Sequence, residues 1–267
     1  MPTPYAARRT VFNGDLLSIG HVVRRGPSHC GELEQQEANV VVFPLQGVFA
    51  KHTGARRQVL GTPSHAMLIG AGEPYRVSFP GGIGEECMTL RFSREQLDAR
   101  TVAPHALLSA RALIMRTILW DLVRRPECDP LEVEEIGLGL LATVQHTAEQ
   151  HSARIERVKE AIAVEPERRW TLSALAELGG ASRYHLARIF REEVGVTVHR
   201  YVTRARLALA LPRVLDADDL TAIALDTGFS SHSHFTARFR SVFGMTPSEL
   251  RKILTAPGAR HRVLLPA

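Results

Sequence analysis

Hydrophobic and polar positions divide the chain into a first part with the pattern of β-strands and a second part with helical periodicity. Between residues 11 and 92 the apolar positions form short runs, separated by turn-forming sequences such as Gly26-Pro27 and Gly61-Thr62-Pro63. Strands of this length with frequent Gly and Pro are typical of a small sandwich or barrel. The runs cover residues 40–43, 48–50, 66–69 and 88–92.

From residue 104 onwards apolar positions recur at helical spacing, which predicts a pair of helices separated by the proline-containing segment 126–130. Gly137 and Gly139 are expected to weaken the second helix. The pair either packs on the strand-rich part or forms a dimer seam, and the periodicity does not decide between the two. The apolar positions are Leu107, Ile114, Ile118 and Leu122 in the first helix and Val133, Ile136, Leu140 and Val144 in the second.

The helical stretch from about residue 154 to 252 contains an internal repeat at an offset of 49 residues. Each copy predicts a short helix, a turn with glycine, and a second helix for which Ser182 or Ser231 is a suitable N-cap. This order is the helix-turn-helix pattern. The identical pairs are Gly179 and Gly228, Ser182 and Ser231, His185 and His234, Phe190 and Phe239, Arg191 and Arg240, Gly195 and Gly244, and Thr197 and Thr246.

Charge is concentrated in the repeated part. Residues 1–151 contain 15 Lys and Arg against 16 Asp and Glu, a net charge of −1, whereas the remaining residues contain 18 against 12, a net charge of +6. On the second helix of each copy, the side opposite the apolar stripe carries polar and basic residues. Such a face suits the major groove of DNA, where Arg can contact guanine. These residues are Tyr184, Arg188 and Arg191 in the first copy and Ser233, Ala237 and Arg240 in the second.

The sequence of residues 154–254 resembles the AraC/XylS family of transcriptional regulators. The resemblance rests on the run 223–235, continued by Phe239-Arg240 and Gly244-Met245-Thr246-Pro247, and on the upstream runs 172–176 and 185–190. It implies a seven-helix double helix-turn-helix domain with a connecting helix at about 198–211. It also implies base contacts by Tyr184, Ala187, Arg188, Ser233, Thr236 and Ala237. We further expect a base contact by His232, and phosphate contacts by Ser182, Arg183, Arg191, Ser231, Arg238 and Arg240.

One position departs from the family pattern. The family usually has Arg where this chain has Ala237, so the second unit is expected to read sequence weakly. On the connecting helix, Arg200, Arg204 and Arg206 lie off the apolar stripe, and we expect some of them to contact phosphates.

Residues 11–92 resemble, more loosely, the cupin-like ligand-binding domains of this family. The histidines His21, His29, His52 and His65 are scattered and no H-x-H-x(3–4)-E motif is present, so we expect neither a metal nor another cofactor. Phosphate-binding loops and nucleophile motifs are also absent from the sequence, which predicts a protein that is not an enzyme. The alternatives are a cupin-type enzyme with a helical adaptor domain, and a DNA-binding protein whose barrel only dimerises.

The cysteines Cys30, Cys87 and Cys128 are odd in number and widely spaced, which favours a reducing compartment. No apolar run is long enough for a membrane helix, and the first residues lack the apolar core of a secretion signal. We therefore expect a cytoplasmic protein without membrane contact.

Together these patterns predict an α+β multidomain protein: an N-terminal cupin-like β-barrel, a helical linker and a C-terminal all-α domain. Its expected function is sequence-specific binding of double-stranded DNA, modulated by a small-molecule effector. We also expect a homodimer, and RNA polymerase is a further candidate partner. The boundaries are 1–103 for the sensor domain, 104–151 for the linker and candidate dimerisation segment, 152–256 for the DNA-binding domain and 257–267 for a tail.

Overall fold

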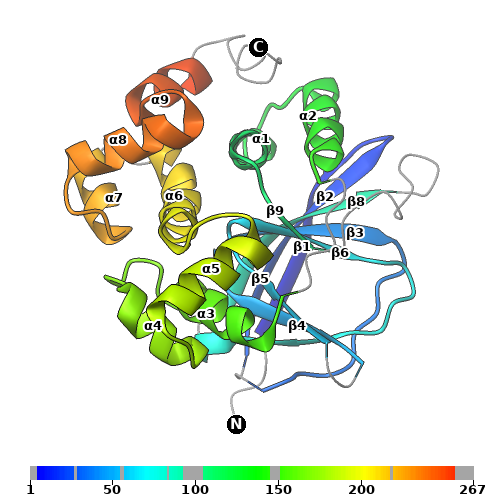
Figure 1. Cartoon of the computed structure of the whole chain (residues 1–267). Helices are drawn as coiled ribbons and strands as arrows, with labels where there is room; N and C mark the ends of the chain where they lie inside the picture. The colour runs from blue at the N-terminus through cyan, green and yellow to red at the C-terminus, as the bar shows by residue number, and fades with distance from the viewer. Residues whose placement is uncertain are drawn as a thin grey trace. The chain divides into compact units, whose positions relative to one another are not determined.

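The computed structural model of the chain describes residues 5–26, 29–54, 57–82, 84–92, 105–144, 151–216 and 219–255. The chain divides into two compact units, Met1–Ala148 and Glu149–Ala267 (Figure 1). Within the described residues the first unit is rich in β-strands and contains the helices α1 and α2, and the second unit is helical. This confirms the predicted α+β organisation. The predicted tail at 257–267 lies outside the described residues.

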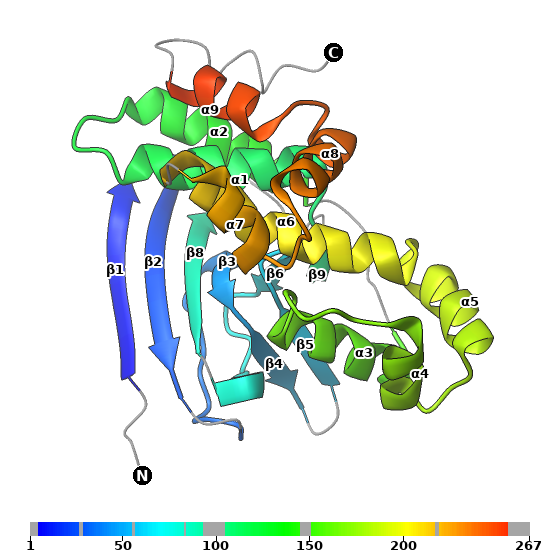
Figure 2. The same ribbon diagram turned by 90° about the vertical axis from the view of Figure 1, so that its left-hand side faces the viewer.

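The strands of the first unit form two antiparallel sheets. The larger has the strand order β1-β2-β8-β3-β6-β9, the first four of which lie side by side in Figure 2, and the smaller has the order β5-β4-β7. Within the described residues the larger sheet is not closed, so a cupin-like barrel stays a prediction. The strands are β1 (Tyr5–Asn13), β2 (Leu17–Arg25), β3 (Asn39–Gly47), β4 (Phe49–Thr53), β5 (Arg57–Gly61), β6 (His65–Ile69), β7 (Arg76–Ser78), β8 (Glu85–Phe92) and β9 (His105–Leu107).

The larger sheet buries side chains on both of its faces. Val22 and Val42 lie on one face, where they form a core with Phe49 and Val77 of the smaller sheet. Side chains alternate along a strand, so the neighbour of Val22 on β2 lies on the other face. His21, on the opposite face, packs against Trp120 with ring centroids 4.9 Å apart. The smaller sheet and the helices therefore cover different faces of the larger sheet.

The helical pair consists of α1 (Ala110–Val123) and α2 (Pro130–Ala142). Two expected members lie outside these helices: Leu107 belongs to β9, and Val144 follows the end of α2. Helix α1 begins later than expected because the Ser109 hydroxyl caps it, accepting a hydrogen bond from the amide of Ala112 at 3.0 Å.

The helical pair packs on the strand-rich part. The guanidinium of Arg116 in α1 donates to the carbonyl of Pro44 in β3 at 2.9 Å, and also to the carbonyl of Pro63. In α2, a Cβ on Gly137 would lie 2.7 Å from a methyl group of Leu17, so this glycine permits the close approach of the helix to β2. Of the two roles left open by the sequence, packing on the strands is confirmed, and the dimer seam stays a prediction.

The second unit consists of helices at the positions that the repeat predicts. Its connecting helix, α6, extends to Asp216 rather than to 211, because Pro212 is accommodated inside the helix and Val214 beyond it is buried. The helices are α3 (Ala153–Val164), α4 (Leu172–Gly179), α5 (Arg183–Val194), α6 (Val198–Asp216), α7 (Leu220–Asp226), α8 (His232–Phe243) and α9 (Pro247–Thr255).

Two features are absent from the described residues. None of their helices combines the length and the apolar character that crossing a membrane requires. No three His, Cys, Asp or Glu side chains of the described part of the chain lie close enough together to hold a metal ion.

Candidate nucleic-acid interface

Both candidate recognition helices, α5 and α8, begin at a serine cap. The hydroxyl of Ser182 accepts a hydrogen bond from the amide of His185 at 3.3 Å, and that of Ser231 accepts one from the amide of His234 at 3.1 Å. Each serine still has its hydroxyl proton to donate, and each is exposed. A helix N-terminus also favours a phosphate through its free amides and dipole. Both caps can therefore donate to the DNA backbone.

Helix α5 separates its buried and exposed sides as the helical wheel predicts. Leu186 and Phe190 are buried in the core, whereas the Tyr184 side chain is 90% exposed. Four more predicted contact residues of this copy are exposed. They are Arg183, Ala187, Arg188 and Arg191.

Arg188 is held by neighbours on its own helix. Its guanidinium lies 3.0 Å from a carboxylate oxygen of Glu192 one turn later, and 3.4 Å from Nδ1 of His185. The Arg188 side chain is 63% exposed, and an exposed pair of this kind contributes at most about 1 kcal/mol. A guanine edge can therefore take over the guanidinium at little cost.

The predicted contact residues of helix α8 include fewer arginines than those of α5. Its core side is a row of phenylalanines, with Phe235 and Phe239 ring centroids 5.6 Å apart. Thr236 is half-buried, and its hydroxyl lies 3.5 Å from Nε2 of His232. The other predicted contact residues of α8 are exposed: His232, Ser233, Ala237, Arg238 and Arg240.

The half-buried His234 supports the surface of α8. Its Nδ1 lies 3.0 Å from the hydroxyl of Ser230, and its Nε2 accepts a hydrogen bond from Nε of Arg238 at 3.3 Å. Burial, and then the nearby Arg238 and Arg206, lower the pKa of His234 below its usual value. A neutral ring suits an Nε2 that accepts from Arg238. This bond engages Nε of Arg238 and leaves its Nη groups without a hydrogen bond to another described residue.

The two helix-turn-helix copies are joined by contacts that the sequence pattern did not predict. Arg206 of α6 donates to the carbonyls of Pro166 and Arg168, at 2.8 and 2.7 Å. Its guanidinium thus holds the loop before α4. The sequence predicts that some arginines of this helix contact phosphates, but Nε and one Nη group of Arg206 are already engaged by the loop.

The same loop packs against the turn of the second copy. Gly228 has a φ of +86°, and a Cβ at this position would lie 2.5 Å from the carbonyl oxygen of Glu167. Only glycine allows the backbone of the second turn to approach the first half so closely. A groove of about 750 Å³ lies beside these contacts and reaches the recognition helix of the first copy. Residues from both copies line it, among them Trp170, Ala187, His199 and Phe229.

Comparisons with known proteins support this description of the second unit. A family model described as a helix-turn-helix domain matches residues 175–253. The chain is 32% identical over 224 residues to the probable transcriptional regulator LumQ of Photobacterium leiognathi, covering 81% of this chain and 83% of that protein. It is 35% identical over 212 residues to a Streptomyces antibioticus protein described as an AraC-like transcription regulator, covering 79% of this chain and 64% of that one.

Other comparisons are more limited. With an uncharacterized HTH-type transcriptional regulator of Haemophilus influenzae the identity is 33% over 100 residues, and the match covers 37% of this chain and 34% of that protein. The chain thus matches about a third of the length of several relatives. The crystal structure of ToxT from Vibrio cholerae O395 is 12% identical with a TM-score of 0.36, covering 95% of this chain and 98% of that chain.

Proposed function

Because the chain belongs to the AraC family of transcriptional regulators, we propose that it binds a specific double-stranded DNA site with both recognition helices. Helices α5 and α8 enter successive major-groove segments on one side of the duplex. Base edges are read by Tyr184, Ala187, Arg188, His232, Ser233, Thr236 and Ala237. Phosphates are bound by Ser182, Arg183, Arg191, Ser231, Arg238 and Arg240.

The observation that carries this proposal is the joint support of two exposed recognition helices by one long helix. Helix α6 has 19 residues, which corresponds to about 28 Å at 1.5 Å per residue. Successive major-groove segments on one face of DNA are about 34 Å apart. A rigid connection of this length, reinforced by the contacts of Arg206 and Gly228, suits two helices that must keep that spacing.

We further propose that the first unit is a sensor for a small-molecule effector. Residues 1–103 would form its cupin-like ligand-binding part, 104–151 a linker that also dimerises the protein, and 152–256 the DNA-binding domain. An effector can act only by binding more tightly to one of two arrangements of these parts. RNA polymerase is the proposed partner at the promoter, in the cytoplasm. No feature of the described residues favours the alternative of a cupin-type enzyme with a helical adaptor domain.

The DNA-binding proposal predicts a strong dependence of affinity on salt. The logarithm of the association constant should fall linearly with the logarithm of salt concentration, with a slope of about −0.9 for each phosphate contact. Arg191→Ala removes one proposed contact, so the slope should become less steep by about 0.9. Fluorescence anisotropy of a labelled duplex, with the full chain at several salt concentrations, measures both slopes.

The matched control is Arg213→Ala. Arg213 is an exposed arginine of the same unit that pairs with Asp226 at 2.7 Å and lies outside the proposed contact set, so the slope should stay unchanged. Absence of DNA binding, or an affinity that is independent of salt, would contradict the proposed function. Equal effects of the two substitutions would contradict the assignment of Arg191.

A further inference from the structure

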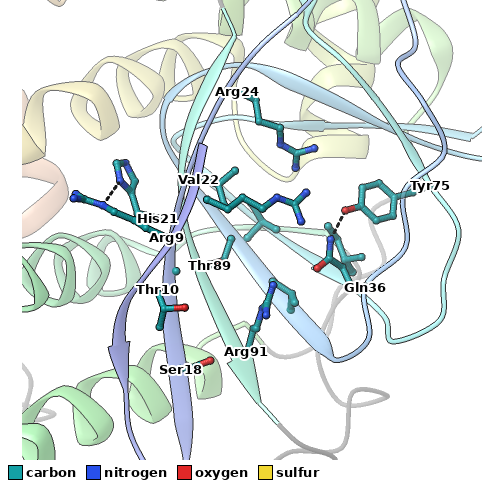
Figure 3. A pocket seen from close by; sticks show the side chains of 15 residues that line it. Arg9, Thr10, Ser18, His21, Val22, Arg24, Gln36, Tyr75, Thr89 and Arg91 are labelled. Carbon is teal, nitrogen blue, oxygen red and sulfur yellow. Dashed lines mark hydrogen bonds between the residues drawn. The ribbon is translucent and has the colours of Figure 1, made fainter. Parts of the chain in front are cut away.

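A pocket in the first unit opens on the face of the larger sheet that is turned towards the smaller sheet (Figure 3). We call it the Gly20 pocket; its lining includes Gly20, Val40, Val42, Tyr75, Thr89 and Arg91. Its volume is about 110 Å³. An apolar cavity of roughly 150 Å³ holds a benzene molecule, so the Gly20 pocket encloses a group of about that size or slightly smaller.

The hollow exists because a glycine stands in the middle of the sheet. On β2, Gly20 lies in register between Thr10 of β1 and Thr89 of β8. A Cβ on Gly20 would come within 2.5 Å of the Thr89 hydroxyl oxygen. Glycine inside a strand weakens the strand and often marks a place where another molecule approaches the backbone. Here it leaves a depression that is bordered by hydroxyl groups.

Part of the pocket lining consists of polar side chains that have no hydrogen-bond or ionic partner among the described residues. Ser18 pairs in register with Arg91, so their side chains lie on the same face as those of Thr10 and Thr89. None of these four side chains hydrogen-bonds or pairs with another described residue. Three hydroxyls and one guanidinium therefore border the hollow with their donors available.

The arginines that line the pocket differ in their partners. Arg8 and Arg24 both contact the carboxylate of Glu34, at 2.8 and 2.6 Å, and Arg24 also contacts Glu85 at 2.9 Å. A fourth arginine of the lining, Arg9, donates from Nε to Nδ1 of His21 at 3.2 Å. Arg91 is the one of the four without a carboxylate or hydrogen-bond partner among the described residues. In Figure 3, Arg24 and Arg91 lie on the same side of the sheet as Gln36 and Tyr75.

Part of the remaining wall is apolar. Val40 and Val42 of β3 lie beside Arg91 and Thr89 in register, and Ile69 of β6 follows next to Val40. These valines and Ile69 are almost completely buried. A ligand that reaches Arg91 can therefore place an apolar part against these side chains, and transfer of that part from water favours binding.

We infer that the Gly20 pocket binds a small monocarboxylate, whose carboxylate contacts Arg91 and the neighbouring hydroxyls and whose apolar body lies on Val40, Val42 and Ile69. A single negative charge matches the one lining guanidinium that has neither a carboxylate nor a hydrogen-bond partner among the described residues. A dianion such as phosphate would bring a second negative charge towards Glu34 and Glu85 and would leave the apolar wall uncovered. The inference rests on the proposed function in one respect: it names the class of ligand that the proposed sensor unit binds.

Isothermal titration calorimetry on the full chain tests this inference with benzoate and hexanoate as probes. Both should bind with one site per chain. Benzamide, which has nearly the same shape without the charge, and inorganic phosphate, which has charge without an apolar body, should bind at least about tenfold more weakly. Binding of benzamide or phosphate as tight as that of benzoate would overturn the inference, as would no binding of either carboxylate.

Variants locate the site. Arg91→Gln should weaken benzoate binding by about tenfold or more, because the charge-assisted hydrogen bonds are lost, and Gly20→Val should abolish binding by filling the hollow. Arg91 is exposed, so its replacement keeps the fold even if Gly20→Val does not. The control is Arg25→Gln, an exposed arginine on β2 outside the pocket lining, which should leave benzoate affinity unchanged. Equal affinities of the Arg91 and Arg25 variants would overturn the inference.

The same protein samples, assayed for binding to the labelled duplex, separate the two proposals. DNA binding without carboxylate binding would refute the ligand class alone. Carboxylate binding without DNA binding would refute the proposed function and leave the pocket assignment in place.

Discussion

Replacing Gly228 by alanine should lower the free energy of unfolding of the second unit by about 2–5 kcal/mol. A left-handed conformation costs an L-residue about 1–2 kcal/mol, and the new methyl group overlaps backbone atoms of Glu167 that cannot rotate away, which costs about 1–3 kcal/mol more. Urea unfolding monitored by the fluorescence of Trp170 measures this change. Trp120 of the first unit is replaced by Phe in every sample so that only one tryptophan reports.

Gly244 provides the matched control. It ends α8 with a φ of +78°, but a Cβ there would meet nothing within 4 Å. Gly244→Ala therefore carries the conformational cost alone, about 1–2 kcal/mol. If both substitutions destabilise the second unit equally, the close approach of Gly228 to Glu167 does not contribute to stability.

The contact at Gly228 also bears on DNA binding. It holds the turn of the second copy against the loop that Arg206 fixes from the other side. A shift of that loop changes the spacing of α5 and α8, and two helices that must enter successive grooves tolerate little change of spacing. Gly228→Ala should therefore weaken binding to a full site more than binding to a half-site. The anisotropy assay with the two duplexes measures this difference.

The helices and caps of the second unit could be predicted because their signals are local. Ser182 and Ser231 stand directly before periodic apolar residues, and the capping bonds span only three residues. The exposed faces followed from the same periodicity, since burial of Phe190 or Phe239 fixes the rotation of each helix. The repeat supplied a second, independent copy of every one of these signals.

The strands were predicted less completely for a physical reason. Apolar runs mark strands that are buried on both faces, and β3 is such a strand. Strand β1 lies at the edge of the larger sheet, and exposed Arg8, Arg9 and Thr10 in its middle give it no apolar run. The prediction from residue 11 onwards therefore missed most of this strand. In the short strand β9, Leu107 fits the helical spacing of the residues that follow, so the sequence pattern predicts a helix where the structure has a strand.

Long-range features of the candidate sites were not accessible from the sequence. The hydrogen bond from Arg206 to Pro166 joins residues 40 positions apart, and no spacing rule connects them. The Gly20 pocket depends on the register that places Gly20 between Thr10 and Thr89 on three different strands. Both features arise from tertiary structure, where a residue's neighbours in space decide its role.

The asymmetry between the two recognition helices leads to the sharpest expectation about DNA sequence. Arg188 can form a bidentate contact with guanine, whereas Ala237, its equivalent in the repeat, offers only a methyl group. Arg188→Ala should cost about 1–3 kcal/mol on the preferred site and relax the preference at one or two base pairs. Ala237→Arg should add a preference for guanine in the other half of the site. Selection from a library of randomised duplexes measures both.

Arg240→Ala is the control that separates base reading from charge. Arg240 is exposed at the position equivalent to Arg191, and we assign it to a phosphate. Its loss should weaken binding to all sequences alike and make the salt slope about one unit less steep, while the selected base pairs stay the same. The opposite pattern, in which Arg240→Ala changes the selected bases and Arg188→Ala does not, would contradict the proposed base-reading face of both helices. Arg188 would then contribute to DNA binding through its charge alone. The tenfold to hundredfold discrimination between bases would then come from the side of the helices that carries Arg191 and Arg240.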